Sequence, residues 1–107
     1  MTANEKLYLL RRSKRMTQPQ FAHWMGITAA RLMAMERGTI RCAAVAYRAK
    51  TTGDIVTILR RRAGLTIRQM AKKTKVSHVA VIRYEMGDWP ADKYLVIVRK
   101  ALHATGI

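Results

Sequence analysis

The chain contains few of the residues that build disulfide scaffolds, metal sites or hydrolytic centres. Its single cysteine cannot form an internal disulfide and suits a reducing compartment. Cys42 is either a reactive thiol beside Arg41 or a small buried apolar residue, and its alanine-rich surroundings favour packing. Only six residues are acidic and the three histidines are scattered, so neither a carboxylate pair nor a metal-ligand spacing is present. We therefore expect a protein that is not an enzyme and needs no metal or cofactor.

Long hydrophobic runs and a secretion signal are also missing. No stretch approaches the roughly eighteen uncharged apolar residues that a membrane helix needs. The first residues, MTANEKLYLLRR, lack the basic and then apolar order and the cleavage site of a secretion signal. We expect a cytoplasmic protein without a membrane partner.

Basic residues are what the chain has in excess. Twenty-one Lys and Arg oppose six Asp and Glu, a formal net charge of +15. Residues 1–50 carry ten basic and two acidic side chains, a net +8, and residues 51–107 carry eleven and four, a net +7. A field of this size attracts polyanions, and the usual cytoplasmic polyanion is nucleic acid. The charge predicts a nucleoid-associated protein.

The chain repeats itself at an interval of forty-nine residues. MTQPQFAHWMGITAARLMAMERG begins at Met16 and LTIRQMAKKTKVSHVAVIRYEMG begins at Leu65. Identical residues fall in register at Thr17/Thr66, Ala22/Ala71, Glu36/Glu85 and Gly38/Gly87. Apolar character is kept at Phe21/Met70, Ile27/Val76 and Leu32/Val81. The simplest account is one module written twice, over residues 1–50 and 51–107.

Each module contains start signals for short helices. A threonine precedes an acidic or amide residue by three positions, the capping-box pattern, at Thr2/Glu5, Thr17/Gln20, Thr51/Asp54 and Thr66/Gln69. Thr28 and Ser77 are expected to cap a third helix, and Thr39 and Asp88 a fourth, over about 40–50 and 91–102. Sustained strand alternation is absent. The sequence predicts an all-α fold of two tandem four-helix units.

The connection between the second and third helices has the features of a helix-turn-helix. Ala22 faces the next helix where only a methyl group fits, Gly26 permits a tight turn, and Ile27 fills the core beneath it. Leu32 anchors the third helix from its buried side, and Lys75 in the second module departs from the glycine at the turn. Left-handed helix ends are expected at Gly38, Gly64 and Gly87.

With these residues in place, the chain resembles the lambda-repressor-like, Cro-type (XRE) DNA-binding domains, twice in tandem. The family pattern is roughly L-T-Q-x-x-L-A-x-x-x-G-V-S-x-x-x-I-x-x-x-E-x-G. The first module matches it at Thr17, Gln18, Phe21, Ala22, Gly26, Ile27, Thr28, Leu32, Glu36 and Gly38. The second module matches it at Leu65, Thr66, Met70, Ala71, Val76, Ser77, Val81, Glu85 and Gly87. The resemblance implies tandem lambda-repressor-like helix-turn-helix units over about residues 5–102.

The resemblance also implies a structural ion pair in each unit. In that family an arginine of the first helix pairs with the glutamate that ends the recognition helix. The matching residues are Arg11 with Glu36 and Arg60 with Glu85. We expect these pairs to tie helices together rather than to catalyse a reaction.

By the same resemblance, the third helix of each unit enters the major groove of double-stranded DNA. The base-reading positions are Ala29, Ala30, Met33 and Ala34 in the first unit and His78, Val79, Ile82 and Arg83 in the second. The first set offers almost only methyl-sized groups. Arg83 can fork onto guanine, and His78 reads a base, contacts phosphate or stays idle. We expect more direct readout from the second unit.

Contacts to DNA phosphate are expected around the second helix of each unit. Gln18 matches the family's phosphate-binding glutamine, and Arg68 replaces it in the second unit, where Ile67 occupies the matching position. The other candidates, each of which is alternatively a solvated surface residue, are Lys14, Arg15, Arg31, Arg37, Lys72, Lys73 and Lys75.

Two further features concern packing and partners. Trp24 and Trp89 are expected in the core or between units rather than as base-stacking platforms. The apolar surplus of helix 91–102 either seals the two units or pairs two chains, and we favour a homodimer through this C-terminal helix. Exposed apolar groups on the first recognition helix suit a protein partner.

The sequence therefore favours a sequence-specific DNA-binding transcriptional regulator of the repressor type, reading DNA through one or both recognition helices. The alternative is a protein-interaction module, antiactivator or antitoxin-like, in which one unit binds a protein partner. A non-specific nucleoid-like binder is favoured by the charge and disfavoured by the motif.

Overall fold

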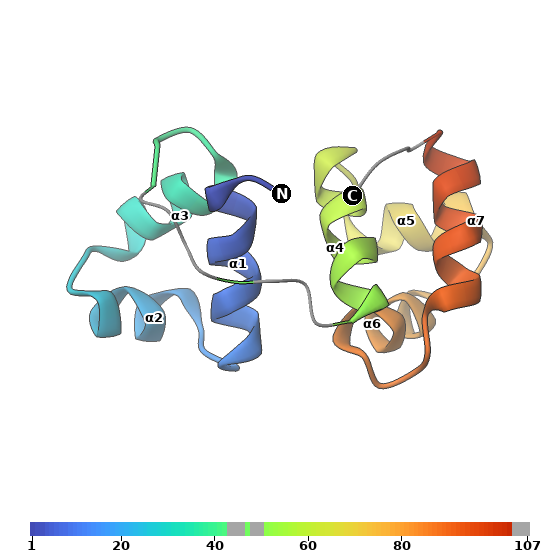
Figure 1. The fold of residues 1–107 in the computed structure, drawn as a ribbon, viewed down its shortest axis with the longest axis horizontal. Helices are drawn as coiled ribbons and strands as arrows, with labels where there is room; N and C mark the ends of the chain where they lie inside the picture. The colour runs from blue at the N-terminus through green and yellow to red at the C-terminus, as the bar shows by residue number, and fades with distance from the viewer. Residues whose placement is uncertain (43–46, 48–50, 104–107) are drawn as a thin grey trace. The chain divides into compact units, whose positions relative to one another are not determined.

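The computed structural model describes residues 1–42, 47 and 51–103. Over these residues the chain is helical, without a strand, as Figure 1 shows. The helices are α1 (Ala3–Ser13), α2 (Gln18–Met25), α3 (Ala29–Arg37), α4 (Thr52–Arg62), α5 (Ile67–Thr74), α6 (His78–Met86) and α7 (Asp92–Leu102). The predicted all-α class is confirmed. Within the described part of the chain, no helix is long and apolar enough to cross a membrane.

The chain divides into two compact units, Met1–Arg48 and Ala49–Ile107. Unit 1 contains α1 to α3 and unit 2 contains α4 to α7. A shift of forty-nine residues places the bounds of α1, α2 and α3 on those of α4, α5 and α6. The sequence repeat is therefore a repeat of helix boundaries as well.

The fourth helix is described in unit 2 alone. It begins at Asp92, close to the predicted start of helix 91–102. In unit 1 the stretch Ile40–Cys42 is not helical, so a helix over 40–50 cannot begin at its predicted first residue. The rest of that predicted helix, apart from Tyr47, lies outside the described residues.

Hydroxyl caps start six of the helices, as the sequence predicted. Thr2, Thr17 and Thr66 form complete capping boxes. The threonine hydroxyl accepts from the backbone N–H of the third helical residue, and the side chain of that residue accepts from the backbone N–H of the threonine. Single hydroxyl caps are formed at the starts of α3, α4 and α6 by Thr28, Thr51 and Ser77. These bonds satisfy N–H groups that have no partner inside the helix.

Two predicted caps are wrong. Thr39 does not start a helix, and its hydroxyl donates to the carbonyl oxygen of Ala34 at 3.0 Å. Asp88 does not start one either, because α7 begins four residues later without a side-chain cap. The backbone N–H groups of Thr39 and Asp88 donate back to Ala34 and Arg83, both at 3.0 Å. Each residue follows a terminal glycine and so closes the preceding helix instead of opening the next.

Left-handed residues end the helices where the sequence placed glycine. Gly26, Gly38 and Gly87 have φ values of 72°, 81° and 80°. Lys75, at the position matching Gly26, adopts the same conformation with φ 59°, and it caps the end of α5. Its departure from glycine therefore leaves the turn intact at the cost of backbone strain.

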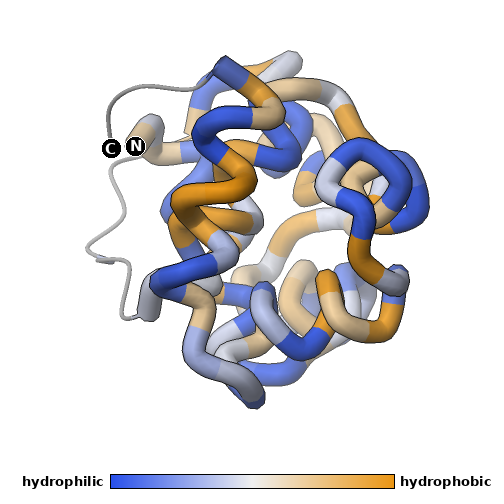
Figure 2. Tube along the Cα trace, turned by 90° about the vertical axis from the view of Figure 1, so that its right-hand side faces the viewer, coloured by the Kyte–Doolittle hydropathy of each residue, from blue (hydrophilic) through white to orange (hydrophobic). Residues whose placement is uncertain are grey.

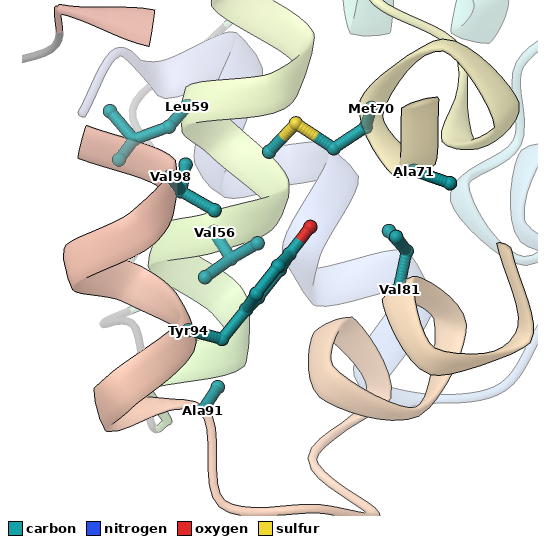
Figure 3. Packing of buried hydrophobic residues seen from close by; sticks show 8 residues of the cluster. All are labelled: Val56, Leu59, Met70, Ala71, Val81, Ala91, Tyr94 and Val98. Atoms are coloured by element: carbon teal, nitrogen blue, oxygen red, sulfur yellow. The ribbon is translucent and has the colours of Figure 1, made fainter. Parts of the chain in front are cut away.

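Each unit has its own apolar core. The core of unit 1 is formed by Leu7, Phe21, Ala22, Leu32 and Met35. The core of unit 2 is formed by Val56, Leu59, Met70, Ala71, Val81, Ala91, Tyr94 and Val98, drawn in Figure 3. Figure 2 shows hydrophobic and hydrophilic residues alternating along the helices, as amphipathic packing requires. The matched apolar pairs of the repeat thus lie in or against matching cores.

A close approach of α4 and α6 depends on a glycine. A Cβ atom added to Gly53 would lie 2.9 Å from the carbonyl oxygen of Glu85 and closer still to that of Tyr84. The matching residue of unit 1 is Asn4, whose amide donates to the carbonyl oxygens of Met35 and Ile40 at 2.6 and 3.0 Å. The two units thus join the same pair of helices by different means, backbone contact in unit 2 and an amide bridge in unit 1.

Candidate nucleic-acid interface

An ion pair fixes the end of α3 in unit 1 and of α6 in unit 2. Arg11 Nε lies 2.7 Å from Glu36 Oε2, and its Nη2 donates to Glu36 Oε1 at 3.1 Å. Arg60 and Glu85 repeat this geometry at 2.7 and 3.1 Å. The side chains of Glu36 and Glu85 are only 2% and 4% exposed. The expected geometry of both pairs is present, and the forked contact sets the orientation of α3 and α6.

A further donor to each carboxylate comes from a different place in the two units. In unit 1, Gln18 Nε2 donates to Glu36 Oε1 at 3.2 Å. In unit 2, where Ile67 occupies the matching position, the buried Thr57 hydroxyl lies 3.1 Å from Glu85 Oε1. Sequence reasoning missed Thr57, because nothing near it in the chain points to a partner twenty-eight residues away. Gln18 is therefore tied to the ion pair, and its contact with phosphate stays a prediction.

The predicted base-reading positions of unit 2 form an exposed surface on α6. Val79 and Ile82 are 47% and 40% exposed, and His78 and Arg83 are exposed as well. The opposite side of the helix holds the buried Val81, so the core fixes which side faces solvent. Val79 and Ile82 can contact thymine methyl groups, and His78 and Arg83 can contact the polar edges of bases.

The predicted base-reading positions of unit 1, on α3, are less exposed than those of unit 2. Ala30 is exposed, whereas Ala29, Met33 and Ala34 are half-buried. Ala29 also packs against the core of its unit. No charged side chain stands among these four positions, so they offer little hydrogen-bond discrimination.

The cations around these helices are distributed unequally. Over residues 66–87, all five basic side chains are exposed: Arg68, Lys72, Lys73, Lys75 and Arg83. Over the matching residues 17–38 there are two, Arg31 and Arg37, also exposed. Lys14 and Arg15, in the turn before α2, are exposed too, and the Lys14 ammonium lies 4.9 Å from the ring centre of Trp24. The segment α5–α6 is therefore the more electropositive of the two.

Neither tryptophan belongs to the core of its unit, so the first alternative of the expectation, core packing, was wrong, and packing between the units stays a prediction. Trp24 is 60% exposed because Phe21 already occupies the core position beside it. The two rings stack with their centroids 5.4 Å apart. Trp89 is 45% exposed and lies edge-on to Tyr84 at 5.5 Å, in the loop that follows α6.

Tyr94 and Cys42 have shifted pKa values, and neither residue is among the predicted base-reading positions. Burial raises the pKa of the Tyr94 hydroxyl, although its bond to Thr74 Oγ1 at 2.9 Å acts in the opposite direction. Burial likewise raises the pKa of the Cys42 thiol, which favours the unreactive protonated form. Cys42 lies against the core of unit 1, in line with a packing residue.

No family of proteins, no curated protein and no solved structure matched the chain. Within the described residues, no group of three or more His, Cys, Asp or Glu side chains is arranged to hold a metal ion. What the chain does must be inferred from its own residues.

Proposed function

We propose that the chain is a sequence-specific DNA-binding regulator of transcription, of the repressor type, with two helix-turn-helix units. The observation that carries this proposal is the α5–α6 segment of unit 2, where an exposed reading surface that includes Arg83 lies on the same short segment as four further exposed cations. Phosphate attraction and base readout need these two properties on the same short segment. Unit 2 is thus the main reader, and unit 1 contributes less.

In this proposal α6 lies in the major groove with its first two turns against the base edges. Arg83 forks onto the O6 and N7 atoms of a guanine, and Val79 and Ile82 contact thymine methyl groups. The buried pair of Arg60 and Glu85 keeps α6 at a fixed angle to α4, so the helix needs no rearrangement to bind.

Phosphate contacts come from the remaining cations of the segment. Arg68 stands at the start of α5, where helix N-termini attract anions, and Lys72, Lys73 and Lys75 follow on exposed positions. If these four residues each neutralise one phosphate, the logarithm of the affinity falls with the logarithm of salt concentration at a slope of about −4. Repressors of this kind act by occupying a site, so binding alone suffices for function.

Electrophoretic shift assays with duplex DNA test the proposal. Arg83→Ala should weaken binding to the preferred site about five- to 150-fold and leave random DNA less affected. Lys73→Ala should weaken binding to all DNA similarly and reduce the salt slope by about one. Arg41→Ala, an exposed cation that the proposal places in no contact, is the control for charge alone. Equal losses for all three variants would contradict reading by α6.

The second candidate function is protein binding through unit 1. It is favoured by the small apolar side chains on the surface of α3 and by the low number of cations over 17–38. It is also favoured by the exposed Trp24 of α2, the helix that precedes α3. Ala30→Glu places a charge on this surface without touching unit 2. If it leaves DNA binding unchanged while Arg83→Ala impairs it, α3 serves something other than DNA, as this second candidate function requires.

We also propose pairing of two chains through α7. Most of its apolar residues pack inside unit 2, but Val96 and Ile97 remain 55% and 45% exposed. These two residues are the part of the predicted homodimer surface that is still available. Sedimentation measures the mass of the Ile97→Asp variant and of the unmodified chain over a range of concentrations. The variant should stay a monomer where the unmodified chain is a dimer. If both are dimers at every concentration, the chains do not pair through α7.

A further inference from the structure

The exposed guanidinium of α6 has an acidic neighbour. Arg83 Nη1 lies 3.4 Å from Asp88 Oδ2, and the two side chains are 52% and 47% exposed. Asp88 was expected to cap a helix, yet it stands just beyond the end of α6 and faces back along it. An acidic side chain next to a proposed DNA contact is costly unless it has a task there.

The corner that carries Asp88 is held firmly in place. Gly87 turns the chain through a left-handed conformation with φ 80°. The N–H groups of Asp88 and Trp89 then donate to the carbonyl oxygen of Arg83 at 3.0 and 3.3 Å. The Trp89 ring lies edge-on to Tyr84, which stacks on the buried Tyr94 at 4.4 Å. The carboxylate is thus kept beside Arg83 by backbone bonds and aromatic packing, even when the exposed ion pair opens.

Unit 1 lacks both members of the pair. The positions matching Arg83 and Asp88 are Ala34 and Thr39. Thr39 forms the same backbone bond to the residue five positions earlier, so the corner itself is conserved between the units. The carboxylate therefore occurs in the one unit where a base-reading position, Arg83, is an arginine.

We propose that Asp88 is a positioning residue that determines specificity, because it aims Arg83 at a guanine and opposes its use on phosphate. This inference rests on the proposed DNA-binding function. Arg83 has five N–H donors, of which Asp88 takes one, and a guanine edge needs two. The pair therefore survives base contact. On a phosphate the carboxylate lies close to a second negative group and repels it.

The effect falls on discrimination rather than on total affinity. An exposed ion pair orders a side chain by a modest amount, which corresponds to a factor of up to about five in an equilibrium constant. Removing the carboxylate lets Arg83 move to phosphates, which raises affinity for random DNA. It also removes the alignment that favours the guanine. Both changes lower the ratio of specific to non-specific affinity.

A double-mutant cycle with the full chain tests this inference. Affinities of the wild type, Asp88→Asn, Arg83→Gln and the double variant are measured by fluorescence anisotropy at about 0.15 M salt. The probes are the preferred duplex, recovered by selection from random DNA, and a scrambled duplex of the same length. Asp92→Asn is the matched control, since it removes an equal charge from an exposed carboxylate that bonds Thr52 instead of an arginine.

We expect Asp88→Asn to reduce the ratio of specific to non-specific affinity about three- to fivefold. Asp92→Asn should leave this ratio unchanged. In the Arg83→Gln background, Asp88→Asn should have no effect on it. If Asp88→Asn and Asp92→Asn shift both duplexes by the same factor, Asp88 contributes only charge and the inference is wrong. If the wild type prefers no duplex at all, the proposed sequence-specific function fails first, and the inference fails with it.

Discussion

The buried ion pair of unit 2 gives the sharpest stability prediction. Glu85→Gln removes the charge opposite Arg60, whose side chain is only 11% exposed and keeps its bond to the Leu65 carbonyl oxygen at 2.8 Å. The variant therefore leaves a cation in a poorly hydrated place without its counter-charge, which costs about 3–5 kcal/mol. A unit of this size has a total stability of about 3–9 kcal/mol. Glu85→Gln should therefore remove about a third or more of the stability of unit 2.

The assay uses the fact that each unit has one tryptophan. In a Trp24→Phe background, Trp89 is the only reporter, and its fluorescence follows the urea unfolding of unit 2. Asp88→Asn is the control, because the exposed pair with Arg83 contributes at most about 1 kcal/mol.

Replacing both partners completes the test. Arg60→Met combined with Glu85→Leu should recover most of the lost stability, because no unpaired charge remains. If Glu85→Gln costs no more than Asp88→Asn, or if the double replacement is as damaging as the single one, the ion pair is not what holds α6 against α4.

Three further predictions concern backbone, turn and core. Gly53→Ala should destabilise unit 2 by about 1–3 kcal/mol in urea unfolding, because the new Cβ meets the Glu85 carbonyl oxygen at 2.9 Å; unchanged or higher stability would exclude that close approach. Lys75→Gly should raise the unfolding midpoint by relieving the left-handed strain while weakening binding to all DNA; a lower midpoint would refute the strain. The raised pKa of Tyr94 stabilises the fold below about pH 10, where the unfolded tyrosine also stays protonated, and this stability is lost as pH rises through the folded pKa. Wild type should therefore lose its advantage over Tyr94→Phe in unfolding experiments above about pH 10, and a constant difference would contradict this.

Local chemistry explains why so much of the fold was predictable. A capping hydroxyl acts within a few residues, so the starts of six helices follow from the sequence and recur at an offset of forty-nine. The matched apolar pairs of the repeat also predicted buried positions on α2, α3, α5 and α6. The two ion pairs followed from the family resemblance rather than from local rules.

The failures have a common physical origin in competition between neighbouring elements. Thr39 and Asp88 are residue types that often cap the start of a helix. The backbone N–H of each donates instead to a carbonyl oxygen of the preceding helix and so closes that helix. Trp24 is large and apolar, but Phe21 had already filled the core beside it. Thr57 contacts Glu85 across twenty-eight residues, and a threonine inside a helix carries no local sign of such a partner. Contacts of this range depend on how helices pack and are not encoded in any short window.

The most direct test of the account is a selection of duplex DNA from a random pool by the full chain at about 0.15 M salt, repeated with Arg83→Ala. The proposal predicts that the wild type enriches a motif containing an invariant G·C pair and that Arg83→Ala loses the preference at that pair alone. A pool that stays random with the wild type, or an unchanged motif with Arg83→Ala, would contradict base reading by α6.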